Sequence, residues 1–185
     1  MNFREHSNLE GRHAFLSASG YHWVNYSEEK LIETYRNQMA VERGTRLHAL
    51  ACQLIKEGVK LPKSKKSLNA FVNDAIGFHM KPEQVLYYSD ICFGTTDAIS
   101  FKNNILRISD YKSGKTPASM MQLRIYAALF CLEYHKKPGE IETILRIYQF
   151  DEIKEETPGA DIIVPVMDKI VTFDKVISRM IEEEL

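Results

Sequence analysis

Two alternating segments around an Asn-Asn dipeptide constrain the fold of this chain more than any other feature. Residues 94–101 (GTTDAISF) and 105–112 (ILRISDYK) have the pattern of β-strands, and Asn103 and Asn104 lie in the short polar break between them. Asparagine tolerates the positive φ that two-residue hairpin turns require. The pattern therefore predicts a β-hairpin in which the numbers of paired residues sum to 207, as 103 and 104 do.

This register places two aspartates opposite each other. Asp97 faces Asp110 and Thr95 faces Lys112, and alternation puts all four on one side of the hairpin. The same face carries Ile99, Phe101, Leu106 and Ile108. The other face is expected to be the wetter one and carries Thr96, Ser100, Lys102, Arg107, Ser109 and Tyr111. A longer loop that takes in Lys102 or Ile105 would give a different register.

Two carboxylates that face each other in a hairpin are unusual if they have only a structural role. Side chains directly opposite in a hairpin lie about 4.5–5.5 Å apart, where like charges repel. Ionised groups at the end of an apolar face are also costly. A divalent cation removes both costs, and hard oxygen ligands suit Mg²⁺ or Mn²⁺. The alternative is that Asp110 and Lys112 form a simple ion pair and that Asp97 ends its strand in solvent.

Two carboxylates, a divalent metal ion and a lysine are suited to phosphodiester hydrolysis. The metal neutralises the scissile phosphate and lowers the pKa of a water molecule. An ammonium group from Lys112 stabilises developing charge or orients the attacking water. The residues predict Asp97, Asp110 and Lys112 as the catalytic set.

Four motifs in order resemble those of the RecB-like PD-(D/E)XK nucleases, a family that includes the nuclease domain of RecB, CRISPR-adaptation nucleases and many phage exonucleases. They are Gly44-Thr45-x-x-His48, Gly94-Thr95-x-Asp97, Asp110-Tyr111-Lys112 and Gln122-x-x-x-Tyr126. The segment AFLSASGYHWVNY is also similar to the N-terminal segment of phage proteins in this group. The similarity runs from about Phe15 to Phe150, with Asp110 in the place of the commoner glutamate.

The resemblance implies further roles. His48 would be a metal ligand from a long helix, together with Asp97, Asp110 and the backbone carbonyl of Tyr111. Gln122 and Tyr126, which share a helix face, would support the DNA or the catalytic lysine. The alternatives are a structural histidine and a core tyrosine. The cysteine positions of iron–sulfur members are not matched, so no iron–sulfur cluster is expected.

Lysines near the site are candidates for contacts with phosphate. Lys115 follows the catalytic strand and is expected to reach a DNA phosphate next to the site. A denser basic stretch consists of Lys56, Lys60, Lys63, Lys65 and Lys66. That stretch is either a track for a phosphate backbone or a solvated loop.

The expected function is that of a Mg²⁺- or Mn²⁺-dependent deoxyribonuclease, by family analogy an exonuclease rather than an endonuclease. It would act in phage or prophage DNA recombination or processing. Its partners would be DNA, a phage recombination or annealing protein and further copies of the chain. The rival functions are a non-cleaving nucleic-acid-binding module and a subunit of a recombination complex. With a net charge of −1, the protein as a whole does not attract a polyanion such as DNA. Basic residues that bind DNA must therefore be grouped locally.

The whole chain predicts an α/β protein with a small central mixed β-sheet flanked by helices, in one domain of residues 1–185. The resemblance makes this a restriction-endonuclease-like PD-(D/E)XK core. Helices are expected from Ser19 or Ser27 to Gly58, with a break near Gly44, and at 67–80, 118–135 and 173–183. Strands are expected at 84–93, 94–101, 105–112 and 141–151. No apolar run is long enough to span a bilayer, so no membrane association is expected. The three scattered cysteines, Cys52, Cys92 and Cys131, do not suggest a disulfide framework, so a location in the reducing cytoplasm of a bacterial host is expected.

Overall fold

The computed structural model describes residues 4–184. Within them the chain divides into two compact units, 4–43 and 44–184, and each is described by itself. Helix α1 (Glu28–Glu57) contributes its first part to the first unit and its last part to the second. The expectation of a single domain stays a prediction.

The first unit contains two short 3-10 helices, η1 (Ser7–Leu9) and η2 (Tyr21–Asn25), and the beginning of α1. The indole nitrogen of Trp23 donates a hydrogen bond of 2.8 Å to the carbonyl of Ser17. Ser27 caps α1, because its Oγ accepts a hydrogen bond of 3.2 Å from the backbone N–H of Lys30. One of the two predicted caps, Ser27, is thereby confirmed.

Among the described residues, the second unit holds a sheet of five strands in the order β1-β2-β3-β4-β5. The strands are β1 (Lys81–Ser89), β2 (Cys92–Lys102), β3 (Ile105–Tyr111), β4 (Glu142–Gln149) and β5 (Glu152–Glu156). Strands β3 and β4 run parallel, and the other neighbours are antiparallel. The protein is therefore an α/β protein with a mixed sheet flanked by helices, as the sequence predicts.

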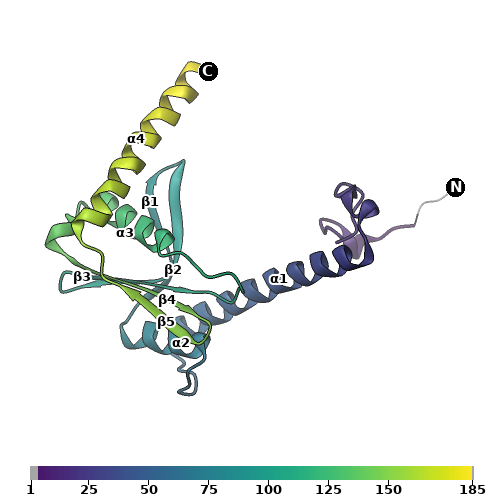
Figure 1. Ribbon diagram of the computed structural model, residues 1–185, viewed down its shortest axis with the longest axis horizontal. Coiled ribbons are helices and arrows are strands. Elements are labelled where there is room, and N and C mark those ends of the chain that lie inside the picture. The colour runs from purple at the N-terminus through teal and green to yellow at the C-terminus, as the bar shows by residue number, and fades with distance from the viewer. Residues whose placement is uncertain (1–3, 185) are drawn as a thin grey trace. The chain divides into compact units, whose positions relative to one another are not determined.

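Helices cover both faces of this sheet (Figure 1). They are α2 (Ser67–Gly77), α3 (Met121–Glu133) and α4 (Ala160–Glu184), with a short 3-10 helix η3 (Pro138–Glu140). One apolar cluster joins α3 and the start of α4 to the face that bears Ile99, Leu106 and Ile108. The other joins α2 and the end of α1 to Ala98, Tyr111 and Tyr148. No helix in residues 4–184 is long and apolar enough to cross a membrane.

The β2–β3 hairpin has the predicted register. Its printed pairs run from Lys102↔Ile105 to Ala98↔Ser109, and every pair sums to 207. Asn103 and Asn104 have φ values of 53° and 59°, the left-handed conformation that a tight hairpin turn demands. The hairpin was therefore predictable from its turn residues.

Other element boundaries differ from the prediction. The turn between β1 and β2 lies at Asp90 and Ile91, inside the segment 84–93 that was expected to be one strand. Helix α2 ends at Gly77, and Pro82 lies in the edge strand β1, where a missing N–H is tolerated. Helix α1 is continuous through Gly44, so the expected break there is wrong.

The C-terminal region departs most from the prediction. A fifth strand, β5, follows the last of the four expected strands and is not among those that the sequence predicts. Helix α4 begins at Ala160, thirteen residues before the expected start, and includes Pro165. The hairpin face expected to be wetter is partly buried under α2 and the end of α1, with Thr96, Ser109 and Tyr111 buried, since both sides of this sheet are covered.

Candidate functional site

The two predicted aspartates lie where the β2–β3 ladder opens. Beyond Ala98↔Ser109, the side chain of Asp97 replaces ordinary strand pairing, because its Oδ2 accepts a hydrogen bond of 2.8 Å from the backbone N–H of Tyr111. Tyr111 follows Asp110 directly on β3, so the carboxyl group of Asp97 lies beside the residue next to Asp110. The hairpin therefore brings both acids to one end of the sheet.

His48 reaches the same place from α1. Its Nδ1 lies 3.3 Å from Oδ2 of Asp97, and its side chain is one-third exposed. The hydrogen bond to Asp97 raises the pKa of His48 above its ordinary value, although burial opposes this shift. Gly44 lies one helical turn before His48, and a Cβ there would stand 3.0 Å from Oγ of Ser113. A glycine at this position lets α1 approach the segment after β3.

Asp110 is the most buried member of the group, with 2% of its surface exposed. Its Oδ2 is buried and makes no hydrogen bond of acceptable geometry, although Nζ of Lys112 lies 3.0 Å away at ion-pair distance. Burial first, and the charge of Asp97 second, raise the pKa of Asp110 to about 6, despite the opposing charge of Lys112. This carboxylate is held in an environment that costs it stability when ionised.

Helix α3 supplies the residues that hold Lys112. The ammonium of Lys112 donates a hydrogen bond of 3.1 Å to Oε1 of Gln122. The amide nitrogen of Gln122 in turn donates one of 3.1 Å to the hydroxyl of Tyr126. Tyr126 lies against Gly94, where a Cβ would stand 2.9 Å from the tyrosine ring. All four residues belong to the motifs singled out in the sequence.

Sequence reasoning missed Gln149, which organises the segment between Lys112 and α3. Gln149 is 7% exposed and lies at the end of β4. Its amide nitrogen donates hydrogen bonds of 2.8 and 2.9 Å to the carbonyls of Gly114 and Thr116, and its Oε1 accepts one of 2.9 Å from the N–H of Ala118. The one signal in the sequence is a lone amide in the apolar strand ILRIYQ.

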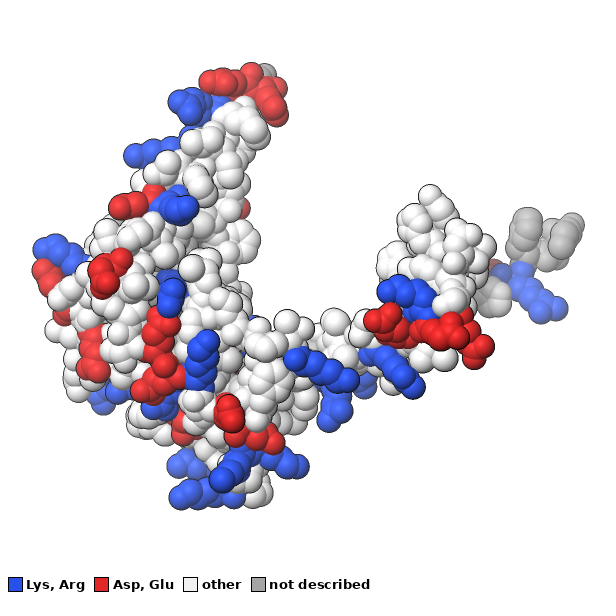
Figure 2. Space-filling model, viewed as in Figure 1, with Lys and Arg blue, Asp and Glu red and all other residues white. Residues whose placement is uncertain are grey.

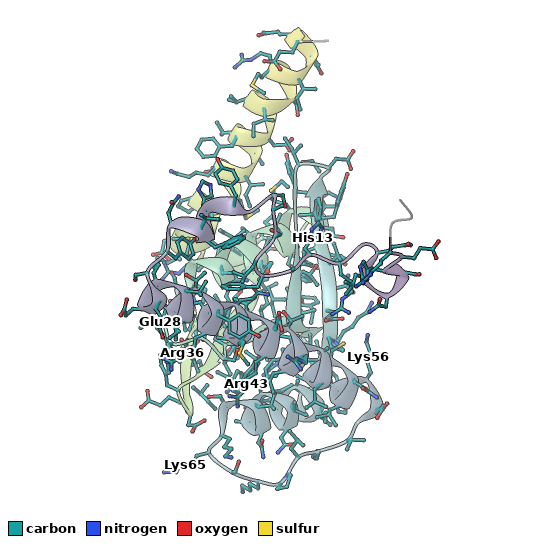
Figure 3. All side chains as sticks on the ribbon, turned by 90° about the vertical axis from the view of Figure 1, so that its right-hand side faces the viewer. His13, Glu28, Arg36, Arg43, Lys56 and Lys65 are labelled. Atoms are coloured by element: carbon teal, nitrogen blue, oxygen red, sulfur yellow. The ribbon has the colours of Figure 1, made fainter. Side chains whose placement is uncertain are left out.

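The candidate phosphate contacts are exposed lysines. Lys115 is exposed in the segment that Gln149 holds. Lysines of the loop 58–66 gather at the lower end of the molecule in Figure 2. Figure 3 shows Lys56 near the end of α1 and Lys65 in this loop. Their exposure fits either of the two interpretations of the basic stretch.

Side chains at this end of the sheet offer ligand atoms for a divalent cation. Among residues 4–184, no three His, Cys, Asp or Glu side chains already form a closed set of metal ligands. The carboxylates of Asp110 and Asp97 are nevertheless hard oxygen donors of the kind that Mg²⁺ or Mn²⁺ accepts, and a neutral imidazole at His48 would add a nitrogen donor beside them. The residues fit such an ion, with Lys112 and His48 balancing the carboxylates in this structure.

No protein-family model matches this chain, and a search of curated proteins finds no significant match. The resemblance to the RecB-like PD-(D/E)XK nucleases therefore rests on the four motifs and their order in the sequence.

Proposed function

We propose that this protein is a metal-dependent deoxyribonuclease of the RecB-like PD-(D/E)XK type. One observation carries the proposal. Residues of three separate motifs meet at one place. His48 lies 3.3 Å from Asp97, and Asp97 accepts a hydrogen bond of 2.8 Å from the N–H next to Asp110. The buried carboxylate of Asp110 is paired at 3.0 Å with Lys112 alone among the described residues. A purely structural cluster gains nothing from burying a carboxylate beside a second carboxylate.

The residues have separate roles in this proposal. Asp97 and Asp110, together with His48 and the backbone carbonyl of Tyr111, would hold Mg²⁺ or Mn²⁺. The ion would supply positive charge to the scissile phosphate and acidify a water molecule. Lys112 would stabilise charge on the phosphate oxygens, because its ammonium is already fixed at the site by Asp110 and Gln122.

The remaining residues serve position and binding. Tyr126 restrains Gln122, which restrains the lysine, so the ammonium enters the reaction in a preset orientation. Lys115 is exposed next to this group and would contact a neighbouring phosphate of the DNA backbone. The exonuclease preference and the role in phage or prophage recombination are part of the proposal through the resemblance alone.

The test is a cleavage assay on linear, circular and single-stranded DNA with Mg²⁺, Mn²⁺ or EDTA. We expect metal-dependent loss of linear DNA that EDTA abolishes. Degradation of linear DNA alone supports an exonuclease, whereas nicking of circles indicates an endonuclease. Binding of DNA without cleavage under every metal condition would favour the non-cleaving module instead.

The matched variant is Lys112→Ala. It should lower the cleavage rate by about 100-fold or more, since loss of one group that stabilises transition-state charge has this effect. DNA binding should change little. The control is Lys102→Ala, which removes an exposed lysine at the turn end of β2. Normal cleavage by the Lys112 variant would show that the assignment of this site is wrong.

A further inference from the structure

Helix α4 carries an apolar stripe along most of its length. Residues at three- and four-residue steps fall on one side of a helix. In α4 these residues are Ile162, Val166, Ile170, Phe173, Ile177 and Met180, with Val176 and Ile181 beside them. The stripe runs from Ile162 to Ile181, and only its first part packs against α3 and the sheet.

The first half of the stripe packs and the second half does not. Val166 and Ile170 contact the core cluster around the buried Ile163. Farther along, the exposed fractions are 58% for Phe173, 41% for Ile177 and 48% for Met180. The charged residues of α4 lie mainly along the other edge of the helix in Figure 2. A contiguous apolar surface of this kind marks a contact surface, which single exposed apolar residues do not.

A groove adjoins the stripe within the same unit. It has a volume of about 740 Å³ and lies between α4, α3 and the β1–β2 turn. Its apolar walls include Ile91, Met121, Ile125, Ile162 and Phe173. A groove beside a helical stripe is suited to an amphipathic helix that offers apolar residues at the same three- and four-residue steps.

Charged residues beside the stripe indicate which kind of helix packs there and whether it runs parallel or antiparallel to α4. Lys169 lies beside Phe173, with its Nζ 5.8 Å from the ring centre. Glu183 follows Lys169 by fourteen residues, which is about four helical turns, so both lie on the same flank of the stripe. The last turn of α4 carries Glu182, Glu183 and Glu184 and no basic residue, although the helix dipole disfavours acids there.

We propose that the occupant is α4 of a second copy of this chain, packed antiparallel. In this arrangement, the apolar stripes of the two α4 helices pack against each other about a two-fold axis near Val176. Lys169 then lies beside Glu183 of the partner subunit, and the symmetry repeats this ion pair on the other side of the axis. A parallel pair would bring the two acidic turns together and would be repelled. The antiparallel pair separates them and gives each a lysine. The C-terminal half of α4 then covers the partner's groove.

The experiment is analytical ultracentrifugation of the full chain over a range of concentrations. The expected species is a dimer of twice the 21.4 kDa chain mass. Phe173→Asp and Ile177→Asp should shift it to monomer, with unchanged circular dichroism because both side chains are exposed. A wild-type monomer at all concentrations, or a dimer that survives both substitutions, overturns the proposal.

A charge exchange tests the direction of packing. Lys169→Glu should weaken the dimer by about tenfold, because two symmetric ion pairs become repulsive contacts. Adding Glu183→Lys to the same chain should restore most of this loss. Lys175→Glu makes the same charge change at an exposed position away from the stripe and should leave the dimer unchanged. Failure of the double variant to recover, with a weakened single variant, contradicts the antiparallel pair.

Discussion

At the scale of single residues, the Asp110 carboxylate has the least favourable environment of the site. It is almost completely buried and close to the charge of Asp97, and within residues 4–184 its buried Oδ2 is held only by the ion pair with Lys112. An environment that disfavours a charge in the metal-free protein becomes favourable when a cation is bound. The cost in stability and the proposed activity thus have the same origin.

Because burial of the Asp110 carboxylate destabilises the metal-free protein, Asp110→Asn should increase the stability of the fold in the presence of a chelator, by an amount that depends on pH. The pKa of Asp110 rises from an ordinary 3.8 to about 6 on folding, so the folded protein binds more protons than the unfolded one between these values. Wild-type stability should therefore fall as pH rises from about 4 to about 6. The substitution should raise the free energy of unfolding at pH 8 by about 1–3 kcal/mol, and by less at pH 4.5.

Urea unfolding at the two pH values measures this effect. Asp168→Asn is the matched control, because Asp168 is exposed on α4. A destabilised Asp110 variant at pH 8 would mean that the ion pair with Lys112 outweighs the burial of the carboxylate.

The sequence predicts the positions of candidate site residues in the fold where the information is local. Asp97, Asp110 and Lys112 are placed by one hairpin register, and that register follows from Asn103 and Asn104. The proximity of His48 to Asp97 followed only from the resemblance, because no local pattern fixes where a helix meets a sheet end. The three hydrogen bonds of Gln149 depend on the path of a distant loop.

At the scale of elements, the segment from β3 to α3 connects both halves of the site. It carries Lys115 and leads from Lys112 to Gln122, and the buried Gln149 amide fixes it at three points. The segment has no regular structure of its own, so this one side chain satisfies backbone groups that a helix or sheet would otherwise pair.

Gln149→Met should therefore loosen the segment. We expect a loss of about 1–3 kcal/mol in the free energy of unfolding, because methionine removes all three hydrogen bonds to the segment. Cleavage should fall as well, since Lys112 and Gln122 lie at the two ends of the segment. Gln53→Met on the exposed side of α1 is the control. Unfolding midpoints that do not differ between the two variants would show that Gln149 does not hold the segment.

Helices and strands were harder to predict where their residues are not typical of the structure that they adopt. Strand β5, Glu152-Ile153-Lys154-Glu155-Glu156, is exposed along almost its whole length, so it lacks the apolar alternation that marks a strand. The start of α4 was missed because Pro165 usually ends a helix, yet here it lies near the N-terminal end and faces the groove. Strand β5 is held by antiparallel pairing with β4, the strand just before it, and α4 is held by packing against α3.

At the scale of the whole molecule, metal binding is expected to be linked to folding. A ligand that binds only the folded state adds about 2.7 kcal/mol of stability at a free concentration of 100 times its Kd. For a chain of 185 residues this corresponds to a rise in Tm of several degrees. Mn²⁺ should produce this rise in the wild type and in Asp168→Asn, but not in Asp97→Asn.

Differential scanning calorimetry with and without Mn²⁺ makes the measurement. An equal rise in the wild type and in Asp97→Asn would place the binding site elsewhere in the molecule.

The position of the metal can be observed directly. Crystals soaked in Mn²⁺ and measured at a wavelength where manganese scatters anomalously give a map of the ion alone. The account predicts a peak in contact with the side chains of Asp97 and Asp110 and beside His48. A peak only at other carboxylates, or none at saturating Mn²⁺, would contradict it.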